Sequence, residues 1–309
     1  MQHITDATID ALLTPADAQA VLLDALRCQG EGQAAMQERI RTEAGGVKLS
    51  TLGAVIPGQG VAGAKVYTTI KGQFSFVILL FSTEDGRPLA SFEANAITRL
   101  RTAACSVIAA RHLARPGARR LALLGAGVQG QAHAEQLAAA FGLEQIRVFD
   151  PHGRAEVITG LQQRCGVPVE SCASAEATIA GADIIVTASR STEPLFAGAL
   201  IPPGCFIAAV GSSLPHTREL DDTALRRTAL IAVEWKQQTL REAGDLVRAA
   251  PDALLPEGKL VELADIVTGR VAGRRHDEDI TLYKSVGVGL QDIALAGLAW
   301  RRAQEAARA

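Results

Sequence analysis

Three glycines and an acid are spaced in this chain as in a turn that binds a phosphate-containing ligand. Gly125, Gly127 and Gly130 follow the apolar run 121–124, and a helix-forming stretch comes next. Asp150 stands twenty positions after the last glycine. Such a turn lets the backbone approach a pyrophosphate at a helix N-terminus, and an acid at this distance can accept a hydrogen bond from a ribose hydroxyl. The pattern predicts a dinucleotide site, and the alternative is a glycine-rich turn without a ligand.

Three cations ahead of the turn form the second group that could do chemistry. Arg41, Lys65 and Arg101 come from different segments and lie in uncharged or glycine-rich surroundings. Together they would suit a small substrate with a carboxylate, because an arginine can bind a carboxylate through two parallel hydrogen bonds. Taken singly, such residues are more often solvated or salt-bridged. Spacing alone does not show that the three converge.

The elements that would position these residues fall into two groups. Short β-type runs separated by glycine-rich turns extend from a strand over 36–41 to one over 89–93, and an alanine-rich helix over 96–113 follows. From residue 120 onward strands and helices alternate, which predicts a parallel sheet with helices on both faces. The expected strands are 121–124, 145–149, 184–187, 206–210 and 230–233. A last helix over 285–309 is expected to return to the first group.

The sequence therefore predicts an α/β protein with two domains. One is a Rossmann-type, doubly wound parallel sheet over 116–285, and the other is a smaller α+β domain over 1–115, joined by the helical segment 286–309. At 309 residues the chain exceeds the usual size of a single core, in agreement with two domains.

Composition excludes several classes of function. The net charge of -2 leaves no basic excess for nucleic acid. No apolar run reaches the roughly 18 residues of a membrane span, and the first residues lack the pattern of a secretory signal. The five cysteines form no C-x-x-C pair, so we expect reduced thiols in a cytoplasmic protein. No metal site is predicted.

Several segments, in order along nearly the whole chain, resemble the ornithine cyclodeaminase/mu-crystallin family. The resemblance implies a Rossmann domain and a second domain that binds the substrate and forms a homodimer. The segments that carry it are 93–104, 123–130, 182–187, 209–222, 242–245 and 283–287.

The resemblance also implies roles for residues at matching positions. Arg41, Lys65 and Arg101 would hold the carboxylate and the reacting nitrogen of the substrate. The positions implied around the cofactor are Thr102 at a phosphate, Gly125, Gly127, Val128 and Gln129 at the pyrophosphate, Thr187, Ala188 and Ser189 beside the nicotinamide, and Val210, Gly211, Val286 and Gly287 in the walls of the nicotinamide pocket.

Residues after the second strand bear on the form of the cofactor. Asp150 would accept hydrogen bonds from a free ribose 2′-hydroxyl and repel a 2′-phosphate, which favours NADH. His152 and Arg154 lie just beyond and could pair with that phosphate instead. We expect NADH or NADPH, with a slight preference for NADH.

One departure from the family pattern concerns the reaction. Where the cyclodeaminases carry an aspartate, this chain has Ser213. Cyclodeamination needs a base to free a second amine, and a serine hydroxyl cannot serve as that base unaided. Ser213 could instead orient the substrate or a water, or simply cap a turn.

We therefore expect reduction of a cyclic imine carboxylate. The named reactions are Δ1-pyrroline-2-carboxylate to L-proline and, as a second possibility, Δ1-piperideine-2-carboxylate to L-pipecolate. Lys65 would polarise the imine nitrogen or supply its proton. The alternatives are an amino-acid dehydrogenase acting on alanine, lysine or arginine, a mu-crystallin-like protein that binds a small ligand, and, last, an ornithine cyclodeaminase.

Overall fold

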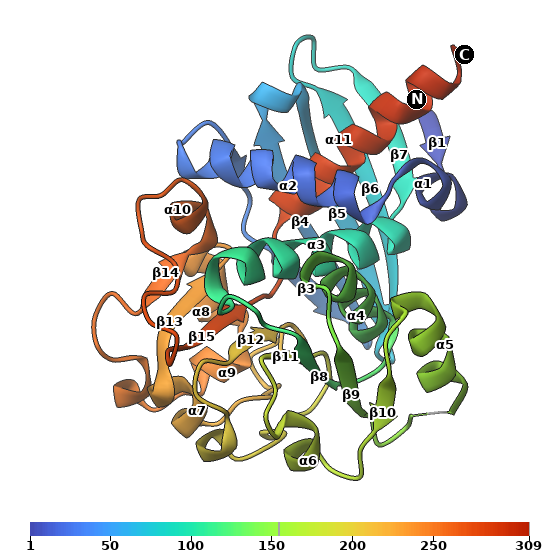
Figure 1. The fold of residues 1–309 in the computed structure, drawn as a ribbon. Coiled ribbons are helices and arrows are strands. Elements are labelled where there is room, and N and C mark those ends of the chain that lie inside the picture. Colours follow the sequence, from blue (N-terminus) through green and yellow to red (C-terminus); the bar gives the residue numbers. More distant parts are fainter. Residues whose placement is uncertain (154, 309) are drawn as a thin grey trace. The chain divides into compact units, whose positions relative to one another are not determined.

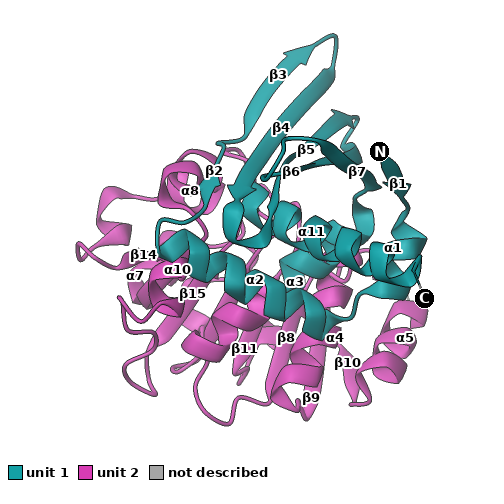
Figure 2. Cartoon of the chain, turned by 90° about the horizontal axis from the view of Figure 1, so that it is seen from above, with its two compact units in different colours: residues 1–104, 287–309 teal, residues 105–286 magenta. Residues whose placement is uncertain are grey.

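The computed structural model describes residues 1–153 and 155–308 and separates into two compact units (Figure 2). Unit 1 comprises Met1–Ala104 with Gly287–Ala309, and unit 2 comprises Cys105–Val286. The division falls inside helix α3 (Asn95–Leu113), whereas the sequence placed the boundary just after that helix.

Unit 1 is built on a seven-stranded sheet in the order β1-β7-β6-β5-β4-β2, with β3 also paired to β4. The strands from β2 to β7 pair antiparallel, and β1 joins β7 in parallel. Its strands are β1 (Gln2–Ile4), β2 (Ala35–Met36), β3 (Ile40–Ala44), β4 (Val47–Ile56), β5 (Val61–Ile70), β6 (Gln73–Ser82) and β7 (Pro88–Glu93). Its other elements are α1 (Asp6–Leu12), α2 (Pro15–Gly30), η1 (Pro57–Gln59), the first part of α3, and α11 (Gly289–Ala306).

Local sequence explains how several of these elements begin and turn. Thr14 and Asp17 form a capping box at the start of α2, with Pro15 in the first turn, where its missing N–H costs nothing. Gly45 and Gly46 have φ of 57° and 77°, so they can form the tight turn between β3 and β4.

The two faces of the unit 1 sheet differ in cover. Helix α11, red in Figure 1, contacts β4, β5 and β6, and it also packs on α2. Leu52, Ile78 and Leu80 are buried on this inner face. Strand pairing places seven exposed apolar side chains together on the opposite face, which we call the outer face: Ile40, Val47, Leu49, Val55, Ile70, Val77 and Phe81.

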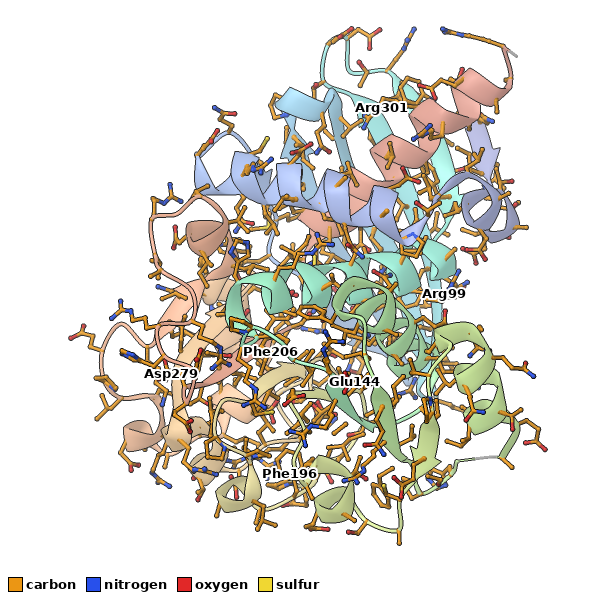
Figure 3. All side chains as sticks on the ribbon, in the orientation of Figure 1. Arg99, Glu144, Phe196, Phe206, Asp279 and Arg301 are labelled. Atoms are coloured by element: carbon orange, nitrogen blue, oxygen red, sulfur yellow. The ribbon has the colours of Figure 1, made fainter. Side chains whose placement is uncertain are left out.

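Unit 2 contains an eight-stranded sheet whose strands are all parallel. Its strands are β8 (Arg120–Leu124), β9 (Gln145–Phe149), β10 (Val169–Ser171), β11 (Ile184–Thr187), β12 (Phe206–Ala209), β13 (Thr228–Val233), β14 (Leu260–Glu262) and β15 (Ile280–Lys284). Between them lie α4 (Val128–Phe141), α5 (Ala155–Cys165), α6 (Ala175–Ile179), η2 (Gly198–Leu200), α7 (Asp222–Arg227), α8 (Lys236–Glu242), α9 (Gly244–Val247), η3 (Pro251–Leu254) and α10 (Leu263–Val267). Phe196 and Phe206 belong to its buried core (Figure 3).

The strand order is β10-β9-β8-β11-β12-β15-β13-β14. Strands that follow β8 in the chain are first added on one side of it, as β9 and β10, and then on the other side, beginning with β11. In open parallel sheets, ligands bind outside the carboxyl ends of the strands at such a reversal. The α/β class and the doubly wound parallel sheet expected from the sequence are therefore confirmed.

Several expected elements were wrong or missing. The strand over 36–41 is two strands, because β2 ends at Met36 and β3 begins at Ile40. The last helix begins at Gly289, not at residue 285. The sequence predicted no strand after 230–233, so it missed β15, which follows the charged run 274–279 and lies between β12 and β13. The sequence also missed β1, β10 and β14, which have three residues each.

Among the described residues, no helix combines the length and the apolar character needed to cross a membrane. All five cysteines are free thiols.

Candidate active site

The glycine turn after β8 has the geometry that a dinucleotide cradle requires. Gly125 has φ of 96°, and a Cβ there would lie 2.7 Å from the Ala188 carbonyl oxygen. A Cβ on Gly130 would lie 1.9 Å from the Gly125 carbonyl oxygen, so only glycine lets α4 approach the turn this closely. A Cβ on Gly127 would meet no atom within 4 Å, which leaves open space at the N-terminus of α4. These residues fit a pyrophosphate at a helix N-terminus.

Val128 and Gln129 form the first turn of α4, and Val128 is exposed. Asp150 lies just after β9, where its Oδ2 accepts the Ala126 N–H at 2.7 Å and its Oδ1 accepts the His152 N–H at 2.8 Å. Asp150 is thus hydrogen-bonded to the glycine turn, and His152, two residues after Asp150, is exposed. Arg154 lies outside the described residues.

The residues expected beside the nicotinamide lie at the carboxyl ends of β11 and β12. Thr187 ends β11, and Ala188 donates its N–H to the Leu124 carbonyl at 2.8 Å. Val210 donates its N–H to the Thr187 carbonyl at 2.9 Å, so the two loops lie next to each other. The hydroxyls of Thr187 and Ser189 donate to one acid that the sequence analysis gave no role, Glu219.

Of three further expected positions, Val286 and Ser213 follow the neighbouring strands β15 and β12, and Thr102 lies in unit 1. Val286, at the end of unit 2, donates its N–H to the Glu234 carboxylate at 3.1 Å. Thr102 lies on the unit 1 part of α3, where its hydroxyl donates to the Thr98 carbonyl at 2.7 Å. Ser213 is half-buried in the loop after β12, and its N–H donates to the Gly211 carbonyl at 3.1 Å.

Within unit 1, Lys65 and Arg101 converge on a buried carboxylate, Asp292 of α11. The Lys65 Nζ lies 3.2 Å and the Arg101 Nε 3.3 Å from the same oxygen, Oδ1. Lys65 also donates to the Thr98 hydroxyl at 2.6 Å and lies 4.3 Å from the centre of the Phe76 ring. Two cations against one acid leave this cluster with one excess positive charge, which favours an anionic ligand.

Arg39 extends this cluster, although the sequence analysis did not select it. Its guanidinium donates to the Gly287 carbonyl at 2.7 Å, and its charge acts on Lys65. A Cβ on Gly287 would lie 2.8 Å from Arg101 Nη1, so this glycine makes room for the arginine. Gly287 therefore lies beside both guanidinium groups, within unit 1.

The position of Arg41 relative to Lys65 follows from strand pairing. It lies on β3 opposite Ser50, and Ser50 pairs with Tyr67 of β5. Because cross-strand partners share a face and alternate residues face the same way, Arg41 is on the same face as Lys65 but one row further along. The charge of Arg39 acts on the Lys65 ammonium, so Arg39 belongs to this cluster together with Arg101.

The surroundings of Lys65 suit proton transfer near neutral pH. Burial lowers the pKa of the ammonium to about 8, and the charges of Arg101 and Arg39 act in the same direction. Asp292 opposes them by stabilising the charged form. A lysine with such a pKa is charged at pH 7 and can still give up a proton readily.

Three residues of this arrangement were missed from the sequence. Asp292 and Arg39 lie in unit 1, and Glu219 lies in unit 2. Asp292 interrupts the apolar helix stretch that begins the last helix, and an acid at such a position is a signal for a buried ion pair. Glu219 lay within a segment that resembled the family, without a role attached to it.

Comparison with known proteins agrees with these features. Residues 9–307 match the ornithine cyclodeaminase/mu-crystallin family. A Delta(1)-pyrroline-2-carboxylate reductase from Bacillus cereus is 35% identical over 269 residues, which cover 85% of this chain and 78% of the relative.

Two solved structures share the whole fold. A probable ornithine cyclodeaminase from Bordetella pertussis Tohama I is 62% identical, with a TM-score of 0.97 over 99% of this chain and 98% of that chain. The Delta(1)-pyrroline-2-carboxylate reductase of Thermococcus litoralis, solved with NADH and L-proline, is 27% identical, with a TM-score of 0.94 over 99% of this chain and 98% of that chain.

A substitution in the glycine turn should weaken NADH binding without lowering the stability of the fold. Gly127→Ala adds a methyl group to open space at φ of -69°, so we expect the midpoint of urea unfolding to stay unchanged. The same methyl group would occupy the space that a pyrophosphate needs, so the Kd for NADH, measured by fluorescence, should rise about tenfold or more. Gly58→Ala in unit 1, whose Cβ would meet only Cys28 Sγ at 3.6 Å, is the control and should leave the Kd unchanged. Equal NADH affinity in both variants would show that the turn holds no pyrophosphate.

Proposed function

The chain belongs to the ornithine cyclodeaminase/mu-crystallin family, and from that premise we propose that it reduces a cyclic imino acid. It is an NAD(P)H-dependent imine reductase that acts on a CH–NH bond. The proposed substrate is Δ1-pyrroline-2-carboxylate, which becomes L-proline, and Δ1-piperideine-2-carboxylate is a second substrate. The observation that carries the proposal is the pair of buried cations, Lys65 and Arg101, on the single carboxylate of Asp292.

The chemistry of the reduction assigns a task to each cation. When bound, NAD(P)H would supply a hydride to the imine carbon, the electron pair of the C=N bond would move to the nitrogen, and the nitrogen would take up a proton. The Lys65 ammonium polarises the nitrogen and supplies that proton. Arg101, together with Arg39 or Arg41, holds the carboxylate and so fixes the ring. Ser213 orients the substrate or a water.

A second candidate function is cyclodeamination, because the 62% identical structure is described as a probable ornithine cyclodeaminase. That reaction needs a base for a second amine, and Ser213 offers only a hydroxyl of ordinary acidity. Amino-acid dehydrogenation also remains compatible with the cations and the dinucleotide turn. Reduction of a preformed imine needs no additional base, so the residues present support it best.

For the cofactor we propose NADH in preference to NADPH. The Asp150 carboxylate lies against the glycine turn, where its charge would repel a 2′-phosphate. His152 is exposed beside it and leaves use of NADPH open. The free thiols support a reducing, cytoplasmic location.

We also propose that the protein is a homodimer formed through the outer face of unit 1. Seven exposed apolar side chains on one sheet face make a patch that soluble monomers rarely leave open. A second copy of the same face is the occupant that fits, because a two-fold dimer pairs a patch with itself.

The substrate proposal is tested by a panel of imines and amino acids with both cofactors. We expect oxidation of NADH with the five-membered imine carboxylate, and a loss of kcat/KM of about 100-fold or more in Lys65→Ala. Ammonia release from ornithine, or faster oxidation of free amino acids than reduction of imines, would instead support the competing functions. Tight ligand binding without turnover on any imine would indicate a binding protein.

The Lys65–Asp292 pair predicts a specific pH profile. Since the proton donor is the ammonium, kcat/KM should be maximal below the Lys65 pKa and fall as the pH rises through about 8. Asp292→Asn removes the group that raises this pKa, so the alkaline limb should move down by about 1 to 3 units. Thr98→Val removes an uncharged partner of Lys65 and should move the limb much less. An alkaline limb that Asp292→Asn leaves in place would rule out Lys65 as the titrating group.

The dimer proposal is tested by placing charge on the outer face. Leu49→Lys combined with Val77→Lys should convert the dimer to a monomer in sedimentation experiments, because two lysines would be buried against the partner. Leu240→Lys in unit 2 is the control, since Leu240 and Val77 are both 44% exposed. A dimer that survives the double change would mean that another surface is used.

A further inference from the structure

A buried acid in unit 2, Glu219, lies between the loops that follow β11 and β12 and takes no part in the chemistry above. Its Oε1 accepts the N–H of Ser189 at 2.7 Å and the hydroxyl of the same residue at 2.8 Å. Its Oε2 accepts the Thr187 hydroxyl at 2.9 Å, the Gly211 N–H at 2.9 Å and the Ser212 N–H at 3.1 Å. One carboxylate thus joins two loops that are separate in sequence.

This arrangement requires close contact and excludes larger residues. A Cβ on Gly211 would lie 2.3 Å from Glu219 Oε1 and 2.1 Å from the Ser189 carbonyl oxygen. Five donors compensate the cost of burying the carboxylate, and three of them are backbone N–H groups, which must be satisfied when buried. If the carboxylate were lost, the two loops would lose their common acceptor at once.

Glu219 is itself held in place by a second buried pair. The N–H groups of Glu219 and Leu220 donate to Asp245 Oδ1 at 2.7 and 2.9 Å. Asp245 Oδ2 lies 2.9 Å from the Lys284 ammonium, which donates to the Ala209 carbonyl at 3.2 Å. Lys284 ends β15 and Ala209 ends β12, so these contacts reach the carboxyl ends of three neighbouring strands.

We propose that Glu219 is a positioning residue for the nicotinamide-binding loops 187–189 and 210–213. The inference rests on the proposed dinucleotide site. Ligands of an open parallel sheet bind outside the carboxyl ends of its strands, and these loops are the extensions of two such ends. A displacement of about 1 Å in a group that orients the cofactor lowers the rate strongly, so a shared anchor for both loops serves binding.

A purely structural role is the competing explanation, and the same sheet provides a matched control. Asp183 precedes β11 at the opposite, amino edge of the sheet, and it is also buried. Its Oδ2 accepts the backbone N–H groups of Arg119 and Arg120, both at 2.9 Å. Asp183 therefore anchors backbone as Glu219 does, and it also pairs with the Arg115 and Arg120 side chains, but it lies at the edge where no cofactor is proposed to bind.

The test compares Glu219→Gln with Asp183→Asn in the full chain. Each amide replaces one acceptor oxygen with an NH2 group that faces N–H donors, so both variants should unfold at lower urea concentration. Only Glu219→Gln should raise the Kd for NADH, by about tenfold. Its KM for NADH should rise accordingly, while the KM for the imine should change less than twofold. Should Glu219→Gln fail to fold, Thr187→Val removes a single donor and should raise the Kd for NADH by a smaller factor.

Each outcome has a distinct meaning. NADH affinity that falls equally in Glu219→Gln and Asp183→Asn, or in neither, would overturn the positioning role while the proposed function stands. With Thr187→Val as the only folded variant, an unchanged Kd would overturn it. A wild-type protein that binds neither NADH nor NADPH would overturn the proposed function and this inference together.

Discussion

One carboxylate oxygen, Oδ1 of Asp292, holds both the Lys65 ammonium and the Arg101 guanidinium inside unit 1. The three residues come from α11, β5 and α3, which are far apart in sequence. Burying one acid between two cations is costly unless the geometry is good and further hydrogen bonds are made, and here Lys65 donates to Thr98 and Arg101 donates to Gln291. This requirement explains why the C-terminal helix must belong to unit 1, although the whole of unit 2 precedes it in the chain.

Unit 2 also buries a charged cluster, in which acids outnumber cations. Glu219 and Asp245 are buried acids with one buried ammonium, Lys284, and many backbone donors. Burial raises the pKa of the Glu219 carboxyl, and the Lys284 charge counteracts part of this effect. In unit 1 the excess charge is positive and suits a carboxylate ligand. In unit 2 the buried acids accept hydrogen bonds from the protein's own backbone, and the open helix N-terminus at the glycine turn would suit phosphates.

Sequence patterns predicted the features whose residues lie close together in the chain. They missed residues whose contacts are with residues far away in the sequence. The glycine turn and Asp150 were predictable because one strand, one turn and one helix contain their spacing. Strand β15 was missed because Thr281 and Lys284 interrupt its apolar residues and it directly follows a charged run. Arg39 was not predicted because it follows Glu38 and lies ahead of β3, which begins only at Ile40, so no local pattern distinguishes it. Asp292 pairs with Lys65, which lies 227 positions away in the chain, and no local sequence pattern predicts such a pair.

The same electrostatic reasoning bears on Ser213. The loop that carries it is anchored through the Gly211 and Ser212 N–H groups to Glu219, a carboxylate already buried close to Asp245. An aspartate at position 213 would add a third acid to this region, and neighbouring like charges favour protonation of one of them. Such a raised pKa would suit a base for a second amine, and Ser213 carries no carboxylate to provide it. In the proposed reduction, a neutral residue at position 213 would leave this loop to the cofactor, and Lys65, whose pKa is lowered by burial within unit 1, would supply the proton.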